Sequence, residues 1–165
     1  MKKHITYLKR LNACSEAIEW ADGFKTMQEV WDNCERGDWM LWLLGKQSGK
    51  PETDSRKKLV LTACKCARLS LKYVARDEKR PFSAIRTAEN YAKGIGNISL
   101  QDVKDAADAA TYAAYAAYAA DAAAAAYAAD AAAYAADAAA YAAQSKTLKK
   151  CAEIVRKDYP KIRMV

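Results

Sequence analysis

The chain of 165 residues contains little proline and little glycine, three and six residues respectively. These low counts exclude a turn-rich β-sandwich and a disordered linker protein. No segment shows the alternation of apolar and polar residues that predicts a strand, so we expect an all-α fold. The length fits one domain, or one domain with an appendage.

Histidine and paired cysteines are also scarce. His4 is the only histidine, and of the five cysteines only Cys64 and Cys66 lie close together in the sequence. A structural zinc site usually combines Cys-x2–4-Cys pairs, or one such pair with histidines. A metal or redox site around Cys64 is therefore the weaker interpretation, and we expect reduced thiols, no metal and no cofactor. We expect His4, near the N-terminus, to be solvated rather than catalytic.

Only one apolar run is long enough to cross a membrane, the alanine-rich segment 105–143, and it contains five aspartates. Each aspartate near the centre of a bilayer would cost about 2.5–3.5 kcal/mol, so we expect no membrane span. No apolar run of signal-peptide length follows the basic N-terminus, so we expect a cytoplasmic protein.

Positive charge predominates, because 27 Lys and Arg residues face 20 Asp and Glu residues and give a net charge of +7. Segment 105–143 has five aspartates and no Lys or Arg, so its charge of −5 leaves +12 for the remainder. A basic surface favours phosphate or an acidic partner. A solvated helix face also explains most of these residues, and no nucleic-acid-binding motif accompanies them.

The spacing of apolar residues and of capping residues predicts a succession of helices. The expected helices cover residues 5–22, 26–34, 38–44, 56–75, 82–93, 99–143 and 146–158. Thr26–Glu29 and Ser99–Asp102 match the capping-box pattern, and Pro81 is expected at the start of a helix. Asp38 and Ser145 are expected N-caps, and Gly45 and Gly94 are expected to end helices. We expect a compact multi-helix bundle with a tryptophan-rich body (1–98), an alanine-rich segment (99–143) and a C-terminal helix (144–165).

The alanine-rich segment is a strong helix former, because 27 of the 39 residues in 105–143 are alanine. A straight helix of this length would span about 58 Å. We therefore expect either one long helix that projects from the body or a helical hairpin. A bend is expected near 119–126, where the spacing of the other residues changes from three to seven.

Tyrosine and aspartate recur in the second half of this segment with a spacing that keeps them on one helix face. These residues, which we call the Tyr/Asp stripe, are Tyr127, Asp130, Tyr134, Asp137 and Tyr141. Tyrosine is common at interfaces, and aspartates can pair with a basic partner, so we expect the stripe to bind a protein. The opposite methyl-only face allows close helix packing and hence an oligomer. The alternative interpretation is a neutral repeat expansion that serves as scaffold.

Catalytic motifs are not found in the sequence, which has no phosphate-binding glycine loop and no hydrolase or metalloprotease signature. Acid–base chemistry would depend on carboxylates near tryptophans, with pKa values raised by burial: Glu16, Glu19, Asp22 and Asp38. Capping and salt bridging explain these carboxylates more simply, so we expect no catalytic residue. The four tryptophans, Trp20, Trp31, Trp39 and Trp42, are expected in the core.

Two segments together resemble a known family. The first comprises residues 14–21 (CSEAIEWA), Trp31 and residues 36–43 (RGDWMLWL); the second comprises residues 63–68 (ACKCAR), Arg80, Pro81 and residues 84–94. They are similar to a family described as immunity proteins of bacterial polymorphic-toxin systems, also carried by phages. The resemblance covers about residues 10–95, together with an alanine-rich helical part and a final helix near 151–156. It implies an all-α, non-enzymatic inhibitor that binds a partner. The regular Tyr/Asp repeat departs from the family's looser alanine-rich pattern.

We therefore expect a protein that neutralises a toxin or a host-defence component by occlusion. An alternative is the sequestration of a small anionic, nucleotide-like ligand in a basic pocket formed by Arg68, Arg80 and Arg156. Ice or surface binding by the alanine helix is a weaker alternative, because alanine-rich ice binders use regularly spaced threonines and segment 105–143 has only Thr111.

Overall fold

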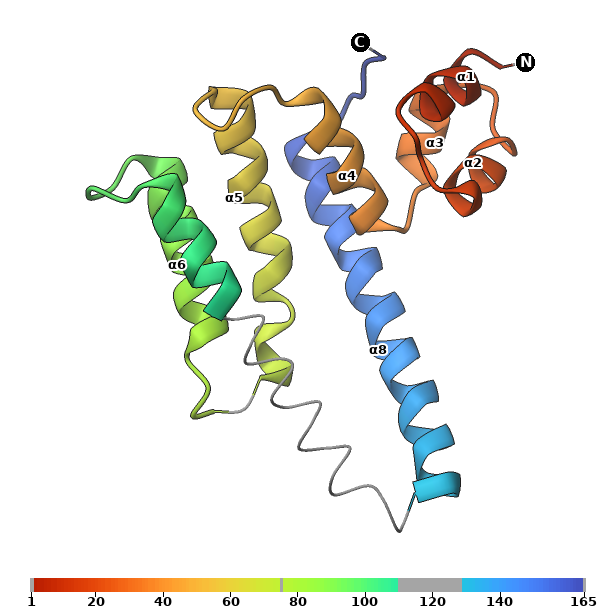
Figure 1. Cartoon of the computed structure of the whole chain (residues 1–165). Helices are drawn as coiled ribbons and strands as arrows, with labels where there is room; N and C mark the ends of the chain where they lie inside the picture. The colour runs from red at the N-terminus through yellow and green to blue at the C-terminus, as the bar shows by residue number, and fades with distance from the viewer. Residues whose placement is uncertain (1, 75, 110–128, 165) are drawn as a thin grey trace. The chain divides into compact units, whose positions relative to one another are not determined.

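The computed structural model describes residues 2–74, 76–109 and 129–164, and the side chains of all of these except 73 and 129–143 (Figure 1). Every regular element in these ranges is helical and none is a strand, which confirms the all-α fold. The chain divides into two compact units. Unit 1 combines Met1–Thr62 with Leu148–Val165, and unit 2 is Ala63–Thr147. None of the described helices has the length and apolar character needed to cross a membrane.

The single helix predicted over 5–22 is in fact two helices, α1 (Lys3–Arg10) and α2 (Ser15–Ala21). Asn12 between them has a φ of 60°, in the left-handed region that asparagine tolerates. Its N–H donates to the carbonyl of Lys9 (3.0 Å), and the N–H of Ala13 donates to that of Leu8 (3.1 Å). This pair of bonds is a Schellman ending. The prediction of one helix was wrong because apolar residues recur at helical spacing on both sides of Asn12, so the spacing does not reveal that the helix ends there.

His4 is buried rather than solvated, with 2% of its surface exposed. Its Nε2 donates to the carbonyl oxygen of Ala21 (3.2 Å) at the end of α2. The break at Asn12 lets α2 pack against α1, and this packing encloses the ring. The first turn of α1 is therefore anchored, and the expectation of a solvated His4 was wrong.

Helices α3 (Met27–Asn33) and α4 (Gly37–Gln47) follow in unit 1. Thr26 caps α3 as predicted, because its Oγ1 accepts the N–H of Glu29 (3.1 Å). In contrast, Asp38 lies inside the first turn of α4 rather than at its N-cap, and Gly45 continues the helix instead of ending it. Burial of Leu43 and Leu44 on the same helix outweighs the cost of about 1 kcal/mol for a helical glycine.

The helix predicted over 56–75 is shorter, since α5 covers Asp54–Arg68 and a 3-10 turn, η1, covers Leu71–Tyr73. Helix α6 (Arg80–Lys93) follows the prediction more closely. Pro81 occupies its first turn, and Gly94 ends it with a φ of 67°. The next helix begins at residue 100, after the predicted capping box. The N–H of Ser99 donates to Oδ2 of Asp102 (2.7 Å), and the N–H of Asp102 donates to Oγ of Ser99 (3.2 Å).

Helix α8 (Ala129–Asp158) is continuous through the position predicted as a helix start. Ser145 therefore lies in its interior and is not a cap, because no glycine or proline interrupts the run and a helical serine costs only a few tenths of a kcal/mol. The predicted bend near 119–126 and Tyr127 lie outside the described residues. Asp130, Tyr134, Asp137 and Tyr141 lie in α8, but their side chains are outside the described set.

The core of unit 1 is built from large apolar side chains of α1, α3 and α4 and of the last turns of α8. Buried members include Ile5, Leu8, Trp31, Met40, Leu43 and Val155. Each such side chain contributes about 1.5–3 kcal/mol when it leaves water. The C-terminal tail adds polar bonds to α3 and α4. Nε1 of Trp31 donates to the carbonyl of Tyr159 (2.8 Å), and Nε2 of Gln47 donates to that of Arg163 (2.8 Å).

Candidate functional site

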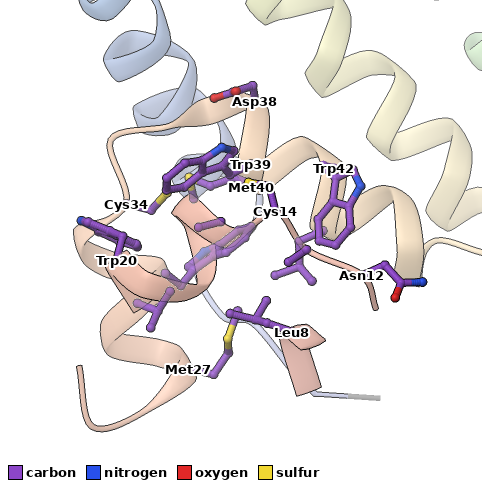
Figure 2. A pocket seen from close by; sticks show the side chains of 15 residues that line it. Leu8, Asn12, Cys14, Trp20, Met27, Cys34, Asp38, Trp39, Met40 and Trp42 are labelled. Carbon is purple, nitrogen blue, oxygen red and sulfur yellow. The ribbon is translucent and has the colours of Figure 1, made fainter. Parts of the chain in front are cut away.

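Unit 1 contains a cleft of about 380 Å³, bordered by α1, α2, α3 and α4 (Figure 2). Its lining is almost entirely apolar, and apart from two thiols only Asn12 and Asp38 contribute polar side chains. We call it the tryptophan cleft. The residues around it are Leu8, Asn12, Ala13, Cys14, Ala17, Trp20, Met27, Val30, Trp31, Cys34, Asp38, Trp39, Met40, Trp42 and Leu43. An apolar concavity of this size with few polar groups is typical of a binding site.

All four tryptophans of the chain line this cleft. Trp31 is 1% exposed and belongs to the core, as predicted, whereas Trp20, Trp39 and Trp42 are only half-buried. The rings of Trp20 and Trp39 are tilted by 57° with their centres 6.0 Å apart, a favoured geometry for aromatic pairs. The core prediction missed the open cleft, although the spacing of Trp39 and Trp42 already places them on one helix face.

Arg36 organises the polar edge of the cleft. Its Nη2 donates to Oδ2 of Asp38 (2.7 Å), its Nη1 lies 3.3 Å from Oε1 of Glu16, and its guanidinium carbon lies 4.3 Å from the centre of the Trp39 ring. Burial by itself raises the pKa of Asp38, but hydrogen bonding and the charge of Arg36 bring that pKa below its ordinary value of 3.8. Asp38 is therefore ionised at neutral pH. The pairing agrees with the salt-bridge interpretation favoured from the sequence, and the alternative of a pKa raised by burial does not hold for Asp38.

Arg156 of α8 binds the backbone at the end of α3, beside the cleft. Its Nη1 donates to the carbonyl oxygens of Cys34 and, at 3.4 Å, of Trp31. Burial raises the pKa of the Cys34 thiol, which is therefore protonated and unreactive at neutral pH. Arg156, predicted as a possible ligand-binding residue, thus joins α8 to the end of α3.

The other two arginines predicted for an anionic ligand lie in unit 2, and each has a carboxylate partner. Nε and Nη2 of Arg68 donate to the two oxygens of Glu89, both at 2.8 Å, in a bidentate pair. Arg80 pairs with Glu78, and hydrogen bonding from Arg80 lowers the pKa of Glu78 to about 2. An anion would have to displace these carboxylates.

The cysteine pair in α5 does not resemble a metal centre. Cys64 and Cys66 are both buried, and Sγ of Cys64 donates to the carbonyl of Ile85 (3.7 Å). Burial raises the pKa of the Cys64 thiol to about 11, which keeps it protonated at neutral pH. Within the described ranges, no three His, Cys, Asp or Glu residues are grouped to hold a metal ion.

Comparison with protein-family models, characterised proteins and solved structures finds no match for this chain. The resemblance to immunity proteins therefore rests on its two segments alone. Residues of the first segment, among them Cys14, Trp20, Asp38, Trp39 and Trp42, line the tryptophan cleft.

Proposed function

We propose that this protein binds another macromolecule and neutralises it by occlusion, without catalysis, as an immunity-type or phage anti-defence protein. The observation that carries the proposal is the tryptophan cleft. Three half-buried tryptophans around about 380 Å³ leave aromatic surface open on an otherwise well-packed unit. Tryptophan is among the residues most enriched at the energetic centres of protein interfaces, where an anchor from the partner fills a pocket.

The chemistry of the cleft favours binding over turnover. Its carboxylate, Asp38, is paired with Arg36 and has a lowered pKa, which makes it a poor proton donor and a weak base at neutral pH. The buried thiol of Cys34 has a raised pKa, which makes it a poor nucleophile. The lining therefore offers apolar contact area rather than an acid–base pair.

The Tyr/Asp stripe is the second contact surface in this proposal. An aspartate row suits a basic patch on the partner, and tyrosines supply apolar area with a polar tip. The proposal assigns the stripe its own contact with the partner, separate from the contact at the cleft.

The test begins with affinity capture from the native host and purification of the captured protein. Its affinity is then measured by calorimetry against the wild type and against a Trp39→Ala/Trp42→Ala variant whose circular dichroism is unchanged. We expect the double variant to raise the Kd at least about tenfold, which corresponds to about 1.4 kcal/mol. The wild type should also suppress the partner's own activity at one equivalent. Full affinity in the double variant would refute the anchoring role.

The stripe is tested with the same partner. Asp130→Lys combined with Asp137→Lys should weaken the complex more than Lys57→Glu combined with Lys58→Glu, which alters charge on α5. Equal effects would remove the stripe from the interface.

The sequestration of a nucleotide-like ligand by Arg68, Arg80 and Arg156 is the rival proposal. It is less favoured because each guanidinium already has a partner in its own unit. Calorimetry with nucleotides distinguishes the two proposals, since a protein that acts only by occluding a macromolecule should give no heat of binding with a nucleotide.

A further inference from the structure

The two edges of the tryptophan cleft carry different charge. At the Asp38 edge, the single guanidinium of Arg36 faces two carboxylates, those of Asp38 and Glu16. At the Trp42 edge, Nζ of Lys46 lies 5.4 Å from the centre of the Trp42 ring. No carboxylate in the described part of the chain pairs with Lys46, which is exposed. The positive charge at the Trp42 edge is therefore available to a ligand, whereas that at the Asp38 edge is already neutralised.

The net charge of unit 1 also favours a negatively charged ligand. The ranges of unit 1 contain 17 Lys and Arg residues against 11 Asp and Glu residues, a net charge of +6. A surface of this sign attracts an acidic partner and speeds its association.

Cations over two of the cleft tryptophans indicate which kind of anchor fits. Arg36 lies over the ring of Trp39, and Lys46 lies over the ring of Trp42. A lysine or arginine from a partner would compete with these cations for the ring faces and would be repelled by their positive charge. An uncharged aromatic ring meets no such repulsion and can adopt the tilted packing that Trp20 and Trp39 already show. The volume of about 380 Å³ lies at the small end of ligand sites, which suits one such side chain rather than a whole helix.

We infer that the cleft binds a protein segment in which one aromatic side chain is followed by carboxylates, with the ring between the tryptophans and the acidic residues at Lys46. This inference rests on the proposed function and specifies the chemistry of the partner at the same site.

Tryptophan fluorescence provides a direct test, because all four tryptophans line the cleft and no other part of the chain contributes to this signal. The probes are three synthetic peptides of equal length without tyrosine or tryptophan. The first carries one phenylalanine followed by two glutamates, the second replaces phenylalanine by alanine, and the third replaces both glutamates by lysines. We expect the first peptide to change the emission saturably and to bind at least about tenfold more tightly than either control.

A pair of charge reversals then locates the acidic contact. Lys46→Glu should weaken binding of the acidic aromatic peptide about tenfold and strengthen binding of the basic one. Lys104→Glu makes the same charge change at an exposed residue of unit 2 and should alter neither affinity more than about twofold.

Three results would overturn the inference: equal binding of the acidic and basic peptides, equal binding of the alanine peptide, or no change in emission with any peptide at millimolar concentration. Each of these results would leave the proposed function intact if the Trp39→Ala/Trp42→Ala variant binds the captured partner more weakly than the wild type does. If that variant binds the captured partner with full affinity as well, both the inference and the proposed role of the cleft are refuted.

Discussion

The described parts of the two units are stabilised by different kinds of interaction. In unit 1, side chains as large as Trp31 and Met40 are 1% exposed, and Val155 is completely buried. In unit 2, the described residues that are buried are small, namely Cys64, Cys66 and Ala92. Solvated ion pairs such as those of unit 2 contribute about 0–1 kcal/mol each, less than one buried large side chain. Among the described residues, unit 1 thus depends on packing, and unit 2 depends more on helix caps and ion pairs.

This difference places the candidate site in the unit whose described core contains the larger buried side chains. The packing that buries Trp31 holds Trp20, Trp39 and Trp42 around the cleft. A binding pocket needs such support, because a loosely held aromatic side chain loses more conformational freedom on binding.

The largest expected effect comes from removing a core tryptophan. Trp31→Ala should lower the free energy of unfolding by about 3–5 kcal/mol, because it leaves a cavity and an unpaired carbonyl at Tyr159. Phe82→Ala in unit 2 is the matched truncation at a side chain that is 44% exposed, and it should cost less than about 1 kcal/mol. Urea unfolding followed by far-ultraviolet circular dichroism measures both. Similar losses would contradict the contrast between the units.

A second comparison uses two glycines of the same helix. A Cβ added at Gly37 would lie 2.7 Å from the backbone N of Ala152, so Gly37→Ala forces α4 away from α8 and should cost about 1–3 kcal/mol. A Cβ at Gly45 meets only the end of the Arg56 side chain at 3.9 Å. Gly45→Ala should therefore stabilise the protein by about 0.5–1 kcal/mol. Opposite signs in thermal unfolding are the expected result, and two stabilising changes would disprove the close approach of α8.

A smaller effect is expected at the end of α6. Gly94 has a φ of 67° and open space around its Cβ position, so Gly94→Ala should cost about 1 kcal/mol through backbone strain alone. Gly94→Asn is the control, because asparagine accepts the left-handed conformation more readily. Equal losses in the two variants, measured by urea unfolding, would assign the effect to something other than backbone conformation.

The smallest effect concerns acid sensitivity in unit 2. Hydrogen bonds from Arg68 hold the pKa of Glu89 below its ordinary value of 4.5 in the folded state. The pair's contribution is therefore complete above about pH 4.5 and is lost as the pH falls through the folded pKa. Glu89→Gln should cost about 0.2–1 kcal/mol at neutral pH and less in acid, as urea unfolding at several pH values will show. A constant loss at every pH would exclude the ion pair as its cause.

Several local signals in unit 2 predicted helix ends correctly, although the cap expected at Ser145 and the helix end expected at residue 75 were wrong. Pro81, Gly94 and the Ser99–Asp102 box act within a few residues, so the ends they predicted were close to those observed. In unit 1 the deciding contacts are distant. His4 bonds to a residue 17 positions away, and Arg156 bonds to one 122 positions away.

The cleft was not predicted because its residues are also distant from one another in the sequence. Its lining comes from four helices, and no local pattern shows that Trp31 is enclosed while Trp39 and Trp42 stay half-exposed. The alanine-rich segment shows the opposite relation between sequence and structure. Its composition predicted helix, and helix α8 is continuous from residue 129 onward.

The central claim is that this protein acts by binding a partner at the tryptophan cleft. The most direct test is the tryptophan emission of the wild-type protein during titration with the purified partner, in a complex confirmed by calorimetry. The account predicts a change that saturates at one equivalent, because the four emitting side chains all line the binding site. Calorimetric binding without any change in emission would contradict it.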